Sequence, residues 1–127
     1  MSNAVRELTE TTFDEEISTS PLPVVVEFWA EWCPQCKLIA PILDSVAADF
    51  PDDLRVCKVN SDERPDLSRR FEVMSVPTIL VFSQGELRRR MIGARSRSRL
   101  LEELSEVITS LSEGPHSPRS SDLRKCQ

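Results

Sequence analysis

The chain has 127 residues, of which 39% are hydrophobic, and carries a formal net charge of -5 at pH 7. This length is typical of one domain that buries a single core without disulfide or metal staples. The acidic balance argues against nucleic acid and anionic membranes as partners, because both select basic surfaces. One arginine-rich stretch, residues 88–99, has no interleaved aromatic residues, and we interpret it as a solvated strand edge and helix start.

The N-terminal segment shows no targeting pattern. No basic stretch leads into a long apolar run, as it would in a secretory signal, and no apolar run approaches the length that spans a membrane. We therefore expect a cytoplasmic protein without membrane association, and we further expect a monomer.

The first half of the chain predicts a strand, a helix and a parallel strand after a short N-terminal strand (residues 5–8) and a short helix around Phe13. Residues 23–30 are almost continuously apolar, as in a strand covered on both faces, and Glu27 is their only charge. Apolar residues at spacings of three and four between 38 and 50 predict a long helix. Residues 54–60 predict the second strand of a right-handed crossover.

The second half predicts a short helix over 64–71, an apolar strand over 77–82 and a hairpin turn at 83–86 into a strand over 87–92. Gly85 supplies the positive φ that such a turn needs. Leucine, valine and isoleucine from 100 to 111 predict one amphipathic helix with arginine and glutamate on its outer face. We expect residues 1–112 to form the domain and residues 113–127, which lack apolar periodicity, to be a disordered tail.

Four cysteines, at 33, 36, 57 and 126, are too few for the disulfide framework of a small secreted domain. We expect Cys57 to be buried and inert and Cys126 to be exposed in the tail. A structural zinc ion would need a second pair of ligands, and the only histidine, His116, lies in the predicted tail. We therefore predict no metal site.

The remaining cysteine pattern is a single Cys-x-x-Cys between a buried strand and a helix. The unpaired N–H groups and positive dipole end of a helix start stabilise a thiolate, and Cys33 falls at the predicted N-cap. Cys36 lies on the first helical turn, within bonding distance of Cys33. We predict that Cys33 is an exposed nucleophile and that Cys36 is a buried resolving thiol.

The motif and its surroundings resemble the thioredoxin family in order and spacing. The resemblance is carried by Phe28-Trp29-Ala30-Glu31-Trp32-Cys33-x-x-Cys36-Lys37, Ala40-Pro41, Val76-Pro77-Thr78 and Ile92-Gly93-Ala94. It implies an α/β thioredoxin fold, in which a central mixed sheet is flanked by helices, and a cis proline at Pro77 beside the dithiol. It also implies a substrate-binding surface formed by Trp32, Pro34, Val76, Pro77 and Gly93.

Glu27 has two interpretations. Burying a carboxylate in an apolar strand beneath the dithiol costs free energy unless the group has a functional role or a charged partner. The family commonly has an aspartate at the matching position, where it relays a proton to or from the resolving thiol, and we favour this role for Glu27. The alternative is an ion pair with Lys58 on the neighbouring strand.

The resemblance implies a protein-disulfide reductase that binds no cofactor and receives electrons from an NADPH-dependent thioredoxin reductase. In that reaction Cys33 attacks a protein disulfide, and Cys36 releases the product from the mixed disulfide. The alternatives are a net oxidant or isomerase and a non-redox module that holds extended polypeptides; the intact dithiol argues against the last. The family's usual Gly-Pro between the cysteines is Pro34-Gln35 here. We expect N–H groups of Gln35 and Cys36 both to face Cys33 and to make the protein a weaker reductant.

Overall fold

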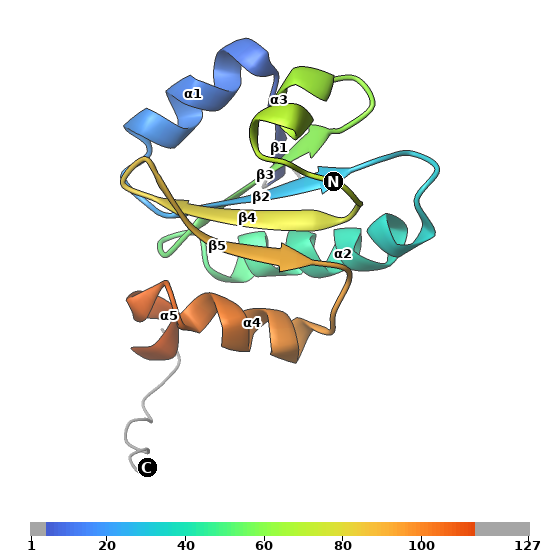
Figure 1. The fold of residues 1–127 in the computed structure, drawn as a ribbon. Coiled ribbons are helices and arrows are strands. Elements are labelled where there is room, and N and C mark those ends of the chain that lie inside the picture. The colour runs from blue at the N-terminus through green and yellow to red at the C-terminus, as the bar shows by residue number, and fades with distance from the viewer. Residues whose placement is uncertain (1–4, 114–127) are drawn as a thin grey trace.

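Five strands form one mixed sheet in the order β1-β3-β2-β4-β5 in the computed structural model, which describes residues 5–113 (Figure 1). The strands are β1 (Val5–Glu7), β2 (Val24–Trp29), β3 (Arg55–Asn60), β4 (Thr78–Ser83) and β5 (Glu86–Ile92). β3 is parallel to both β1 and β2, whereas β4 is antiparallel to β2 and to β5. The predicted α/β class with a mixed sheet is confirmed, and β2 lies at its centre.

Helices cover both faces of the sheet (Figure 1). α1 (Glu10–Thr19) and α3 (Pro65–Arg70) lie on one face, and α2 (Pro34–Asp49) and α4 (Arg97–Ser105) lie on the other. The short helix α5 (Thr109–Glu113) follows α4. Alternate residues of the central strand therefore point into two separate cores, which explains its continuous apolar sequence.

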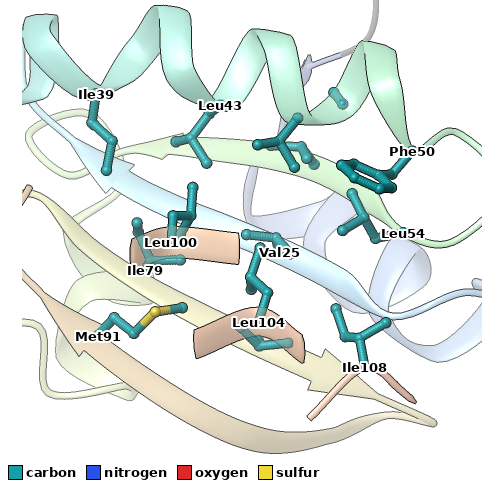
Figure 2. Close-up of a cluster of buried hydrophobic side chains, with 14 residues drawn as sticks. Val25, Ile39, Leu43, Phe50, Leu54, Ile79, Met91, Leu100, Leu104 and Ile108 are labelled. Atoms are coloured by element: carbon teal, nitrogen blue, oxygen red, sulfur yellow. The ribbon is translucent and has the colours of Figure 1, made fainter. Parts of the chain in front are cut away.

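Each face has its own apolar cluster. On the α2 and α4 side, Ile39 and Leu43 approach Val25 and Ile79 from one helix while Leu100 and Leu104 approach from the other (Figure 2). On the opposite side, the Phe13 and Phe82 rings meet edge to face with centroids 5.6 Å apart. The two cores fix β2, and with it the residues that follow its last position.

The entry to α1 is held by reciprocal hydrogen bonds. Thr12 N donates to Thr9 Oγ1 at 3.3 Å, and Thr9 N donates to Thr12 Oγ1 at 2.8 Å. This capping box satisfies two backbone groups that a helix start leaves without partners.

Removal of this cap should cause a modest, measurable loss of stability. We expect Thr9→Ala to lower the free energy of unfolding by about 1 kcal/mol in urea denaturation, because the Thr12 N–H loses its acceptor. Thr9→Ser keeps an acceptor and is the matched control. An equal loss in both variants would mean that the threonine methyl group, rather than the cap, carries the effect.

The predicted hairpin between β4 and β5 is confirmed. Gln84 and Gly85 have φ values of 56 and 80 degrees, so two consecutive residues occupy the left-handed region that tight hairpins require. The turn brings β5 to the edge of the sheet, where the arginines at 88–90 lie as predicted.

The single helix predicted over residues 100–111 is wrong in two respects. α4 ends at Ser105, where Glu106 N and Val107 N bond back three residues to Glu103 O and Leu104 O and tighten the last turn. The next residues include β-branched side chains, which are weak helix formers. The charged residues are also not all on the outer face, since Glu103 is only 6% exposed.

No helix among residues 5–113 is long and apolar enough to cross a membrane. α5 ends at Glu113, one residue beyond the predicted domain boundary. The rest of the predicted tail, with His116 and Cys126, lies outside the described residues.

Candidate redox site

The Cys-x-x-Cys motif lies where the central strand β2 leads into α2. Cys33 is the N-cap residue of α2, with φ -91 and ψ 111 degrees, and Pro34 occupies the first helical position. A proline there costs no helical hydrogen bond, since that N–H has no intrahelical acceptor. Cys33 and Cys36 form a disulfide with Cα atoms 5.3 Å apart. The predicted N-cap and the predicted pairing are both present.

One backbone donor reaches the Cys33 sulfur. Cys36 N donates to Cys33 Sγ at 3.1 Å, as expected for an N-cap acceptor. The second expected donor, Gln35 N, is not among the hydrogen bonds that the described residues make to this sulfur, and Gln35 is exposed. The extra donor behind the expectation of a weaker reductant is therefore missing among the described residues, and that expectation loses its structural basis.

The predicted exposure of Cys33 is wrong. Cys33 is 2% exposed and Cys36 is 4% exposed, so exposure does not distinguish the two thiols. As the cap of α2, Cys33 turns inward to its disulfide partner, and its sulfur lies 3.6 Å from Val76 O within an apolar cluster that includes Ala30. The two residues differ instead in their surroundings, since Cys36 lines a pocket of about 160 Å³ with Glu27, Trp29 and Lys58.

Glu27 is the buried carboxylate of this pocket. It is 4% exposed, and its Oε2 is buried without a hydrogen-bond partner among residues 5–113. Burial raises the pKa of Glu27 from 4.5 to about 7, opposed by the positive charge of Lys58 and reinforced by Asp44 and Glu7. A group with such a pKa exchanges protons near neutral pH, which is what a proton relay needs.

The alternative of an ion pair between Glu27 and Lys58 is wrong. The two residues are directly opposite in the β2–β3 register, but no salt bridge joins them within the described chain. Lys58 Nζ instead lies 5.2 Å from the centroid of the Trp29 ring. Its charge therefore acts on Glu27 across the pocket. Trp29 is half-buried and forms part of the pocket wall.

The residues predicted to bind substrate lie on several segments around the disulfide. The Val76–Pro77 peptide bond is cis, as the resemblance implied. Gly93, with φ 94 degrees, donates its N–H to Pro77 O at 2.8 Å, so the Gly93 loop lies beside this proline. Trp32 is 68% exposed, and its Nε1 donates to Asp62 Oδ2 at 2.8 Å.

A groove of about 300 Å³ runs beside Val76 and is lined by Trp32, Val73 and Met74 among others. Met74 is 91% exposed and forms an apolar rim that sequence reasoning missed. Pro34 is exposed on α2. The arrangement offers an apolar surface next to the sulfur atoms.

Outside this site, Cys57 is a free thiol buried in β3, and burial raises its pKa to about 12. A thiol with such a pKa is not a nucleophile at neutral pH, as predicted for an inert position. Among residues 5–113, no group of three His, Cys, Asp or Glu side chains is placed to hold a metal ion.

Comparison with known proteins gives one consistent result. The sequence model of a family described as Thioredoxin matches residues 4–106. The chain is 38% identical to a thioredoxin of Mycobacterium tuberculosis over 109 residues, which cover 86% of this chain and 94% of the relative. It is 40% identical to a thioredoxin of Pseudomonas aeruginosa over 108 residues, 85% of this chain and 100% of the relative.

A third relative has a different organisation. A protein of Mycobacterium leprae named as a bifunctional thioredoxin reductase/thioredoxin is 38% identical over 105 residues. The match covers 83% of this chain and 23% of that protein.

Proposed function

Because this chain belongs to the thioredoxin family, we infer that it is a thiol–disulfide oxidoreductase that reduces protein disulfides. The observation that carries this conclusion is the Cys33–Cys36 disulfide at the N-terminus of α2, within a match that spans most of the chain. Such a pair cycles between dithiol and disulfide and transfers two electrons in each cycle.

The first chemical step is assigned to Cys33. Its thiolate attacks one sulfur of the substrate disulfide, so that a Cys33–substrate bond forms, the substrate S–S bond breaks and the other substrate sulfur leaves as a thiolate. The helix start stabilises the Cys33 thiolate through its dipole and the Cys36 N–H. Its place beside Val76 O, next to the groove, supports this role.

The second step is assigned to Cys36 and Glu27. Cys36 loses its proton and attacks Cys33, which reforms the protein disulfide and releases the second substrate sulfur as a thiolate. Glu27 shares the pocket of Cys36, and its pKa of about 7 suits it to accept that proton. Lys58 contributes by lowering the pKa of Glu27 from across the pocket, in opposition to the effect of burial.

The substrate segment is proposed to lie in an extended form against Val76 and Pro77, between Trp32 and Pro34 on one side and Gly93 on the other. Val76 is half-buried and Pro77 is buried, so Val76 is the more accessible of the two, and Trp32 gives a broad apolar contact. The apolar rim at Met74 favours substrates with an apolar side chain near the reactive cysteine.

Electrons are proposed to return from a flavin- and NADPH-dependent thioredoxin reductase. The relative from Mycobacterium leprae supports a reductase partner, since its name joins both activities in one chain. No cofactor is needed for the exchange itself, because the reducing electrons reside in the dithiol. We further propose that the protein acts as a cytoplasmic monomer, with residues 1–112 as its functional domain.

Insulin reduction tests this function. With a thioredoxin reductase and NADPH, the protein is expected to reduce insulin disulfides with continuous NADPH oxidation. A net oxidant or isomerase would turn over poorly in this direction, and a module that only holds polypeptides would not turn over. If NADPH is not oxidised in the coupled assay but the chemically pre-reduced protein still cleaves insulin, the failure lies with the reductase and not with the dithiol.

A further inference from the structure

The loop that follows β5 is held by a partly buried arginine. Arg95 Nη2 donates to Ile92 O at 2.7 Å and to Gly93 O at 3.3 Å. Its Nη1 is bonded to Glu103 Oε1 of α4, and the side chains of Arg95 and Glu103 are 16% and 8% exposed. The guanidinium therefore ties two loop carbonyls to a fixed point on a helix.

Glu103 is a suitable anchor for this guanidinium. Its second carboxylate oxygen accepts from Arg99 Nε at 2.8 Å. Burial alone would raise the pKa of Glu103, but the hydrogen bonds from Arg99 and Arg95 outweigh it and leave the pKa below its usual value. The carboxylate is thus ionised and oriented by two arginines, and of these it is the Arg95 guanidinium that bonds to the loop carbonyls.

The position of this loop matters because Gly93 contacts the cis proline. Gly93, whose carbonyl Arg95 holds, donates its own N–H to Pro77 O at 2.8 Å. A continuous chain of hydrogen bonds runs from Glu103 through Arg95 and Gly93 to the cis proline beside the disulfide.

Stability alone does not explain this arrangement. A buried ion pair is often no more stabilising than apolar residues of the same volume, because both charges lose their hydration. Within the described part of the chain Arg95 Nε is also buried without a hydrogen-bond partner, which adds to the cost. Two apolar side chains would fill the space between the loop and α4, but they could not hold the carbonyls of Ile92 and Gly93.

We propose that Arg95, anchored by Glu103, is a positioning residue that sets the Gly93 loop against Pro77 for the binding of polypeptide disulfides. This inference rests on the proposed substrate surface around Pro77 and Gly93. It predicts an effect on polypeptide substrates and none on the intrinsic reactivity of the dithiol, which Arg95 does not contact.

The test compares two disulfides in single-turnover reactions of the pre-reduced protein. In Arg95→Met the second-order rate constant for insulin is expected to fall about tenfold, because the loop loses both of its hydrogen bonds to the guanidinium. The rate constant for the small disulfide dithiobis-nitrobenzoate and the redox potential against glutathione are expected to stay at their wild-type values. Arg99→Met, which removes the other partner of Glu103 and leaves the loop contacts, is the matched control and should reduce insulin normally.

A double variant separates positioning from stability. Arg95→Leu/Glu103→Leu replaces the ion pair with apolar side chains, so it is expected to fold even if Arg95→Met does not, and still to reduce insulin slowly. Insulin reduction at the wild-type rate in the double variant would overturn the proposal, as would equal slowing of both disulfides in Arg95→Met. A wild-type protein that reduces dithiobis-nitrobenzoate but not insulin would instead overturn the proposed function on which the inference rests.

Discussion

Cys33→Ser is expected to abolish insulin reduction, whereas Cys36→Ser is expected to retain the first step and accumulate mixed disulfides with its substrates. A serine hydroxyl does not attack a disulfide, so removal of the nucleophile stops the reaction at its start. Removal of the resolving thiol leaves the Cys33–substrate bond without its internal attacker. Mass spectrometry under non-reducing conditions would detect the trapped adducts in Cys36→Ser only.

The fold of Cys33→Ser should survive, because the serine oxygen can accept the Cys36 N–H and continue to cap α2. Cys57→Ala is the matched control, since it removes a buried thiol that takes no part in the exchange, and it should keep turnover. The role assignment would be reversed if iodoacetamide at neutral pH labelled Cys36 faster than Cys33 in the reduced wild-type protein. Such labelling is the decisive measurement, because the exposed fractions of the two cysteines are almost equal.

Glu27→Leu is expected to stabilise the protein by about 3 kcal/mol above pH 7, and by little at pH 4. The folded protein keeps the Glu27 proton up to a pKa of about 7, whereas the unfolded chain releases it near 4.5. Between these values the folded state binds more protons than the unfolded state, so the free energy of unfolding falls as pH rises. The loss is complete above pH 7 and amounts to about 3 kcal/mol, at roughly 1.4 kcal/mol for each pKa unit.

Urea unfolding of the oxidised wild-type and Glu27→Leu proteins at pH 4 and pH 8 would measure this difference. Glu31→Leu is the matched control, because Glu31 is exposed and lines the same pocket, and it should change the free energy of unfolding by less than about 0.5 kcal/mol. A gain for Glu27→Leu that is the same at both pH values would assign the effect to apolar packing and not to the buried carboxylate. The same variant should slow the release of mixed disulfides if Glu27 accepts the Cys36 proton.

Local chemistry explains which parts of the fold the sequence predicts well. β2 is recognisable because both of its faces are buried, so that every position except Glu27 is apolar. The start of α2 follows from Cys33 and Pro34, whose preferences for the cap and the first helical position agree. The β4–β5 turn follows from Gly85 in the same way.

The errors arise where tertiary contacts overrule local patterns. Cys33 was expected to be exposed because nucleophiles must be reached, yet the cap geometry and the contact with Val76 turn its sulfur inward. The expectation that glutamate lies on the outer face of the last helix fails at Glu103, whose spacing of three from Leu100 places it on the buried face. That spacing, together with Arg99 four residues before it, was the available signal for the ion-pair network.

The buried thiol of Cys57 can report how often the structure around it opens. The residue lies in β3, with β1 on one side and β2 on the other, and its thiol is 1% exposed. The thiol lies in the apolar cluster that α1 covers with Phe13 and Ile17. An alkylating reagent reaches the sulfur when this cover opens, so the rate at which Cys57 is modified reports how often that happens. Because the Cys57 thiol takes no part in the Cys33–Cys36 exchange, its modification rate can be compared in the oxidised and the reduced protein. A difference would show that the redox state of the site changes how often the structure around β3 opens.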